Sequence, residues 1–107
     1  MTRNDHELVC DALDHLAVLH QHLERSDLDD QTVADAVSLR LASAIEAISE
    51  TSERFRDRTF GDDWKIIWAT RNRISHGYAY IDMGLIRATV IHDLPDFERG
   101  LRESLAE

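Results

Sequence analysis

Apolar side chains recur at intervals of three and four residues along most of the chain, and this spacing restricts the possible folds more than any other feature. A helix with about 3.6 residues per turn brings such positions onto one face, whereas a strand needs strict alternation. No alternating pattern of any length is present, and the chain contains only four glycines and one proline. The sequence therefore predicts an all-α fold, an antiparallel bundle of four or five helices.

Two long amphipathic helices are predicted first, at roughly 4–24 and 31–54, with Asp29 or Asp30 as the N-cap of the second. We expect them to pack antiparallel through two apolar stripes. The stripes are Leu8, Ala12, Leu16, Leu19 and Leu23 in the first helix, and Val33, Val37, Leu41, Ala44 and Ile48 in the second.

The second half of the chain is predicted to begin with a loop at 55–62. Asp62 or Asp63 then caps a third helix, which ends at Gly77. Further helices are predicted to start at Asp82 and near Asp93, the latter with Pro95 in its first turn, where the missing N–H does no harm. The inward-facing side chains of the helix that starts near Asp93 are expected to be Leu94, Phe97, Leu101 and Leu105.

Length and composition indicate a single domain over residues 1–107, since about 100–150 residues commonly build one core. The only cysteine, Cys10, has no internal partner for a disulfide, and the N-terminal stretch lacks the apolar region of a signal peptide. No apolar run approaches the roughly 20 residues that cross a bilayer. We therefore expect a cytoplasmic protein without membrane attachment.

The formal net charge of −9 argues against a general nucleic-acid binder, because phosphate binding depends on Lys and Arg. The charge is uneven, however. Residues 1–53 hold three basic and twelve acidic residues, whereas residues 54–107 hold nine of each. Residues 54–73 alone hold six basic residues against three acidic ones, so this stretch is the one that can face a phosphate chain.

The segment RNRISHGY at 71–78 concentrates polar chemistry at the end of an apolar helix. Histidine can accept and donate a proton near neutral pH, and arginine can clamp a phosphoryl oxygen through two N–H donors. Both suit phosphodiester cleavage. On a continuous helix Arg71 and His76 would lie roughly 140° apart. Their convergence requires either that the helix ends between them or that a second copy approaches across a two-fold axis.

The pattern Arg71-x4-His76-x-Tyr78 resembles the signature of HEPN ribonucleases in the form found in HepT toxins. The runs DAVSLRLASAIEAISE, DDWKIIWATRNRISHGY and HDLPDFERGL resemble the family's order of elements over most of the chain. The resemblance implies a homodimer with a composite cleft, metal-independent RNA cleavage without a cofactor, and a minimal nucleotidyltransferase antitoxin. It implies catalytic roles for Arg71 and His76 and AMP modification of Tyr78. Asn72 is the polar neighbour of the arginine, and we expect it to contribute to substrate binding by orienting a side chain or the phosphate through a hydrogen bond.

Each of these residues also has a structural interpretation. His76 and Arg73 can be cations that complement the C-terminal dipole of a helix, and Arg73 is equally open to a substrate-binding role. Tyr78 and Tyr80 can pack with a wet hydroxyl group. Trp64 and Trp68, one turn apart, favour a packed helix face over a base-stacking platform. The N-terminal histidines form no recognisable metal-ligand spacing, and we expect no metal.

Two rival functions are compatible with the same sequence. One is a non-catalytic HEPN module that binds a nucleotide or a nucleotidyltransferase partner through the same helix end. The other is a purely structural helical adaptor that docks through its acidic N-terminal half.

Overall fold

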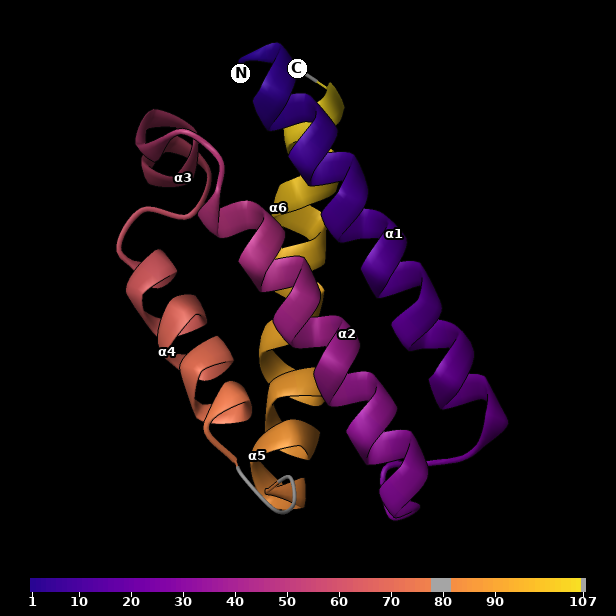
Figure 1. The fold of residues 1–107 in the computed structure, drawn as a ribbon. Helices are drawn as coiled ribbons and strands as arrows, with labels where there is room; N and C mark the ends of the chain where they lie inside the picture. Colours follow the sequence, from indigo (N-terminus) through magenta and orange to yellow (C-terminus); the bar gives the residue numbers. More distant parts are fainter. Residues whose placement is uncertain (78–81, 107) are drawn as a thin grey trace.

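Helices account for most of the chain. The computed structural model describes residues 1–77 and 82–106, and within these residues it contains no strand (Figure 1). The helices in chain order are α1 (Arg3–Arg25), α2 (Gln31–Ser49), α3 (Glu53–Thr59), α4 (Asp63–Ser75), α5 (Met83–Ala88), the π-helical turn η1 (Thr89–Asp93) and α6 (Leu94–Ala106). The prediction of an all-α bundle is confirmed.

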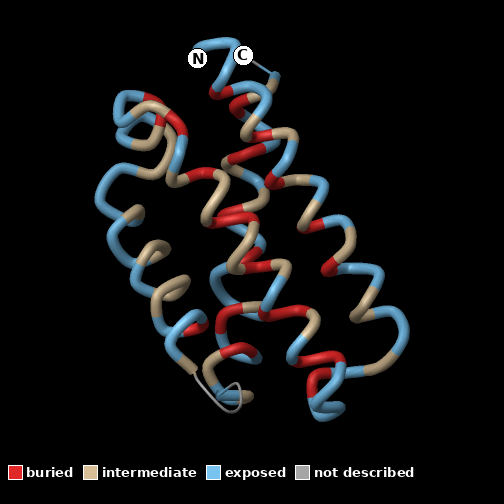
Figure 2. The backbone as a smooth tube through the Cα atoms, viewed as in Figure 1, coloured by how far each residue is buried: buried red, intermediate tan, exposed pale blue. Residues whose placement is uncertain are grey.

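The core is built on α1 and α2, which run antiparallel beside each other (Figure 1), and it extends to buried residues of the later helices. Asp30 is the N-cap of α2, as predicted, and its side chain accepts a hydrogen bond from the Thr32 N–H. All five residues of the predicted α2 stripe are buried; in α1 the three central residues are buried, while Leu8 and Leu23 are half-buried at the edges. Figure 2 shows the buried positions following the facing sides of the helices.

A buried carboxylate joins the start of α1 to the start of α3. The Asp5 side chain is 1% exposed. Its Oδ1 accepts from the Ser52 N–H at 2.7 Å, and its Oδ2 accepts from the Ser52 hydroxyl at 2.8 Å and the Thr2 N–H at 3.2 Å. Burial by itself raises the pKa of Asp5, but the hydrogen bonds from Ser52 and Thr2 outweigh it and hold the pKa below its usual value. Because Thr2 and Ser52 are also the N-caps of α1 and α3, this carboxylate links two helix starts.

The predicted loop at 55–62 is wrong, because α3 occupies most of it and α2 ends at Ser49 instead of near 54. Ser52 caps α3 by accepting from the Phe55 N–H at 3.2 Å, and the Phe55 ring is fully buried. Arg56 donates to the carbonyls of Ser49 and Thr51 and so satisfies the end of α2. A helix of two turns with one buried apolar side chain is too short to produce a visible periodic pattern.

The predicted helix start at Asp82 is confirmed, since its carboxylate accepts from the Leu85 N–H at 3.0 Å. The predicted separate start near Asp93 is wrong, because α5, η1 and α6 form one continuous helix. Within it the Leu94 N–H bonds to the Thr89 carbonyl, five residues back. In a regular α-helix the Pro95 ring would collide with the carbonyl four residues earlier. The wider π-turn makes room for that carbonyl, so the helix continues through the proline.

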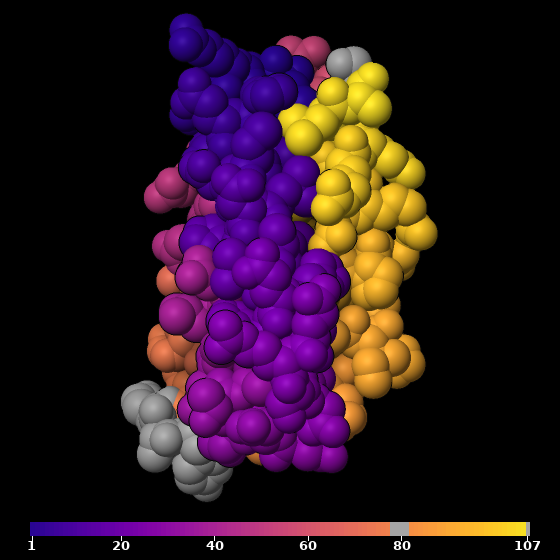
Figure 3. Space-filling view, turned by 90° about the vertical axis from the view of Figure 1, so that its right-hand side faces the viewer, coloured from indigo at the N-terminus to yellow at the C-terminus, as the bar shows by residue number. Residues whose placement is uncertain are grey.

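The long α5–α6 helix closes the bundle from one side and α4 from another. Figure 3 shows α6 lying along α1, and the His20 Nε2 and Glu98 Oε1 atoms join these helices at 2.8 Å. α4 packs against α2 instead. No described helix is long and apolar enough to cross a membrane. Nor do the described residues place three or more His, Cys, Asp or Glu side chains together in a group that could hold a metal ion.

Candidate active site at the end of α4

α4 carries the polar segment that the sequence singled out. Its N-cap is Asp62, one of the two predicted positions, although the Asp62 side chain makes no capping hydrogen bond. The preceding turn depends on Gly61, whose φ of 56° is a conformation that favours glycine. The helix ends at Ser75, close to the predicted stop at Gly77, and the Gly77 N–H bonds to the Ile74 carbonyl at 3.2 Å.

A column of aromatic rings holds α4 in place. Phe97 of α6 stacks on Phe60 at a centroid distance of 5.4 Å, Phe60 lies 6.3 Å from Trp64, and Trp64 lies 6.1 Å from Trp68. α6 comes close to this column at Gly100, where a Cβ atom would lie 3.2 Å from the Phe60 ring. Both tryptophans are half-buried against the core, which confirms the prediction that they form a packed helix face.

Arg71 continues this column on the side of α4 that faces α2. Its guanidinium lies over the Trp68 ring at 4.8 Å from the centroid. Its Nη2 forms an ion pair with Glu46 of α2, and its Nη1 donates to the Asn72 Oδ1 at 3.1 Å. The Arg71 side chain is 25% exposed. The predicted polar neighbour Asn72 thus contacts the guanidinium of Arg71, and the structure adds an acidic partner, Glu46.

His76 lies just beyond the end of α4 as its C-cap residue, and its N–H bonds to the Asn72 carbonyl at 3.0 Å. One of the two conditions for convergence is therefore met, since the helix ends before His76. The imidazole is exposed, and it forms no hydrogen bond or ion pair within the described part of the chain. No hydrogen bond joins it to Arg71 there, and its place at a helix end fits a proton-transfer role and a dipole-complementing role equally well.

Arg73 is separated from Arg71 by about 200° around the helix. It is exposed and borders a surface pocket of about 520 Å³ at the end of α4, together with Gly77 and Asp82. Tyr78 and Tyr80, on which the modification and packing predictions fall, lie outside the described residues.

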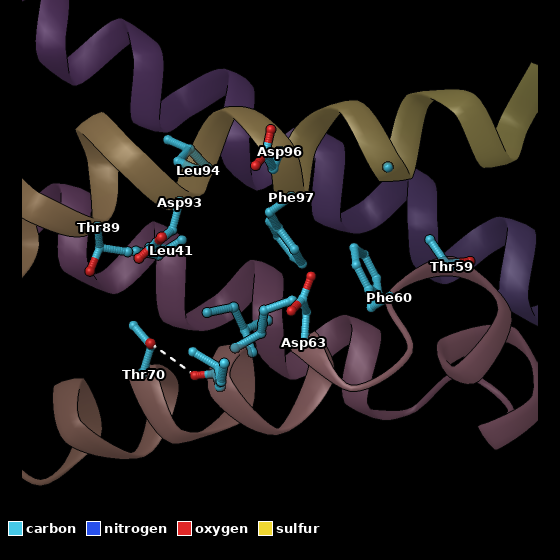
Figure 4. Close-up of a pocket in the computed structure, with 14 residues that line it drawn as sticks. Leu41, Thr59, Phe60, Asp63, Thr70, Thr89, Asp93, Leu94, Asp96 and Phe97 are labelled. Carbon is cyan, nitrogen blue, oxygen red and sulfur yellow. Dashed lines mark hydrogen bonds between the residues drawn. The ribbon is translucent and has the colours of Figure 1, made fainter.

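A second groove, of about 370 Å³, lies between α4 and the η1–α6 helix and is shown in Figure 4. Its floor is apolar, and its edge carries the carboxylates of Asp63, Asp93 and Asp96. Among the described residues that line it there is no Lys, Arg or His. Carboxylates without cations repel a phosphate chain, so this groove is a poor place for RNA.

The basic stretch 54–73 only partly meets the expectation that it faces a phosphate chain. Arg56 is engaged with backbone carbonyls and lies 5.6 Å from the centroid of the Trp64 ring, which gives it a structural role. Lys65 and Arg73 are exposed on α4. The cations available near the helix end are therefore fewer than the composition suggested.

Glu46 is the residue of this cluster that sequence reasoning missed. It is the single charged residue in the run from Leu41 to Ile48, whose other members are apolar or small. A single acid on an amphipathic helix is ordinarily a solvent-facing residue, so the sequence gives no signal that Glu46 pairs with a cation. The pairing depends on how α2 and α4 are placed against each other.

The all-helical bundle, with Arg71, Asn72 and His76 at the end of one helix, is the arrangement expected of a HEPN protein. A family model described as Ribonuclease HepT-like matches residues 9–104, nearly the whole chain. The chain belongs to the ribonuclease HepT-like family. No curated protein and no solved structure gives a significant match.

Proposed function

We propose that this protein is a metal-independent endoribonuclease and the toxin of a toxin–antitoxin pair. The observation that carries the proposal is the guanidinium of Arg71, held by Trp68 and Asn72 just over one turn before His76 in a chain of the ribonuclease HepT-like family. This combines a fixed phosphate-binding cation with a residue that transfers protons.

In the proposed reaction the RNA 2′-oxygen attacks the adjacent phosphorus, so that a new P–O bond forms while the bond to the 5′-oxygen breaks. The 2′-hydroxyl loses a proton and the departing 5′-oxygen gains one, and His76 moves these protons. Arg71 neutralises the charge that builds on the phosphorane, and Asn72 orients the guanidinium. Arg73 contributes to substrate binding. The products are a 2′,3′-cyclic phosphate and a 5′-hydroxyl.

The dependence on the 2′-hydroxyl gives a direct test. The purified, tag-free protein, incubated with EDTA, should cut an oligoribonucleotide and leave the same sequence in DNA intact. Mass spectrometry should find the cyclic phosphate on the upstream fragment. Cleavage of the DNA, or an absolute need for a divalent cation, would contradict the proposed chemistry.

A homodimer with a shared cleft is part of the proposal. It is supported by the absence of a hydrogen bond between Arg71 and His76 among the described residues and by Ile66 of α4, an apolar side chain that is 66% exposed. Mixing subunits that carry Arg71→Ala with subunits that carry His76→Ala tests it. If each cleft takes the two residues from different chains, random mixing restores about one quarter of the wild-type activity. A strictly monomeric active species would rule the dimer out.

The proposed antitoxin is a minimal nucleotidyltransferase that adds AMP to Tyr78. Tyr78 follows His76 by two residues, so each added phosphodiester places about one negative charge next to the catalytic segment and repels RNA. Co-expression with a transferase encoded beside this chain should add AMP-sized mass increments at Tyr78, and Tyr78→Phe should stay active and escape neutralisation. Increments confined to Tyr80, or none, would point to inhibition by tight complex formation.

The ion pair between Arg71 and Glu46 favours a second candidate function, a non-catalytic module that binds a nucleotide or a nucleotidyltransferase. In this case the neutralised arginine serves mainly to hold α4 on α2. A purified dimer that leaves all cellular RNA intact would support this candidate over the ribonuclease.

A further inference from the structure

Three different contacts restrain the guanidinium of Arg71. Glu46 engages Nη2, Asn72 accepts a hydrogen bond from Nη1, and the Trp68 ring covers one face of the plane. Trp68 and Asn72 belong to α4 itself, within three residues of Arg71. Glu46 is the only one of the three that comes from another helix, so it alone ties the guanidinium to the body of the bundle.

The place of Glu46 on α2 differs from that of an ordinary surface acid. Its neighbours Ala44, Ile45 and Ile48 are buried in the core, which makes this part of α2 a rigid support. The Glu46 side chain itself is 47% exposed. The backbone of Glu46 is therefore fixed by the core, while its carboxylate reaches the surface beside the guanidinium of Arg71.

We propose that Glu46 is a positioning residue for the ribonuclease reaction, holding the guanidinium of Arg71 so that its unused N–H donors face the scissile phosphate. The inference rests on the proposed function. A guanidinium carries five N–H donors. In Arg71 the contact with Glu46 engages Nη2, and the contact with Asn72 engages Nη1. The remaining donors keep a fixed direction, and a fixed direction matters most when charge develops in the transition state.

Kinetics on a short fluorogenic oligoribonucleotide separate positioning from simple binding. Glu46→Ala frees the guanidinium, so kcat should fall by about 10–100-fold while KM changes by less than about threefold. Glu46→Gln keeps an acceptor oxygen of the same reach, and its kcat should fall by less than about tenfold. The control is Glu50→Ala, which removes an exposed acid from the end of the same helix and should match the wild type.

A second measurement does not depend on RNA cleavage. The Nε–Hε signal of Arg71 in a ¹⁵N-edited NMR spectrum, assigned by its loss in Arg71→Lys, should be sharp and well dispersed in the wild type and in Glu50→Ala. It should broaden or move to the solvent-averaged position in Glu46→Ala. The melting profile of Glu46→Ala should stay cooperative, which shows that the variant is folded. The same NMR spectrum of Glu46→Gln tests the effect of removing the charge while the shape of the side chain is kept.

The two measurements distinguish the possible failures. A wild type that does not cut RNA refutes the proposed function, and the NMR signal then still decides whether Glu46 orders Arg71. An active wild type with unchanged kcat in Glu46→Ala overturns the positioning role. A rise in kcat also overturns it, because it would show that the carboxylate quenches the arginine. An unaltered Arg71 signal in Glu46→Ala overturns it as well.

Discussion

Asp5 and Glu46 each join two helical elements through a carboxylate, and the comparison between them separates a stabilising contact from a contact at the candidate site. Asp5 is 1% exposed, and its oxygens accept three hydrogen bonds from Thr2 and Ser52. Glu46 has a side chain that is 47% exposed, and it forms an ion pair with the guanidinium of Arg71. The first arrangement leaves no donor for a ligand. The second holds Arg71 while several of its donors have no partner among the described residues.

The burial of the two carboxylates explains why they have different consequences. A buried acceptor leaves its partners unsatisfied when it is removed, and that cost appears as lost stability. A half-exposed ion pair contributes little to stability, because water replaces either partner readily. We therefore expect changes at Asp5 to affect unfolding, and changes around Arg71 to affect activity.

The largest expected effect is on activity at the candidate site. Replacing Arg71 or His76 with Ala should lower kcat/KM for RNA by about 10²–10⁴-fold, since each change removes charge stabilisation or proton transfer. The free energy of unfolding should change by less than about 1 kcal/mol, because neither side chain lies in the core. Steady-state cleavage assays measure the change in kcat/KM, and urea denaturation measures the change in the free energy of unfolding. A variant that stays folded and keeps near-normal cleavage would show that its residue has no catalytic role.

The opposite outcome is expected at the Asp5 contact. Asp5→Asn replaces an acceptor oxygen with an NH₂ group that faces N–H and O–H donors, and should lower the free energy of unfolding by about 2–4 kcal/mol. Cleavage per folded molecule should remain close to that of the wild type. Asp11→Asn, which changes an exposed acid of the same helix, is the matched control. Equal stabilities for the two variants would remove the distinction between the two contacts.

The pH dependence of stability sharpens the comparison further. Hydrogen bonds from Ser52 and Thr2 keep the pKa of Asp5 below its unfolded value. Between the folded and the unfolded pKa, the unfolded chain therefore binds more protons than the folded one. The contribution of Asp5 is therefore complete above the unfolded pKa of about 3.9 and is lost as the pH falls through the folded pKa. Urea denaturation of the wild type and Asp5→Asn at about pH 6 and about pH 3 should show their difference shrinking in acid. A difference that stays constant would mean that the carboxylate charge contributes nothing.

The smallest expected effect belongs to Arg73, which lies on another side of α4 from the Arg71–Glu46 pair. Arg73→Ala should raise KM for RNA by about threefold and weaken its salt dependence, with kcat unchanged, as for a residue that contacts a distant phosphate. Arg3→Ala provides the control, since Arg3 is an exposed cation near the N-terminus, at the opposite end of the bundle (Figure 1). A fall in kcat as large as that of Arg71→Ala would mean that Arg73 belongs to the reacting cluster.

Much of the fold follows from local patterns in the sequence. The stripe of α2 and the caps at Asp30 and Asp82 are predictable because apolar spacing and capping act within a few residues. The errors lie at α3 and at η1. The first is too short to show periodicity, and the second continues a helix past Pro95 through a wider turn that no local rule signals.

The candidate site is predictable as a set of residue types but not as an arrangement. Arg71, Asn72 and His76 stand close together in the sequence, so the amino-acid sequence is enough to indicate their chemistry. Nothing in the sequence connects Glu46 to them, and nothing in it indicates the acidic groove on another side of α4. Both depend on the distance and rotation between helices.

The sequence by itself determined that this chain forms amphipathic helices, that its acidity is N-terminal, and that its HEPN signature falls at a helix end. Only the tertiary structure decided that Glu46 of α2 meets Arg71 of α4 and that Ser52 meets Asp5 across 47 residues of chain. The physical reason is the range of the forces. Backbone hydrogen bonds and apolar spacing act within a turn or two of the chain, whereas a pairing between helices exists only after the whole core has set their rotation and separation.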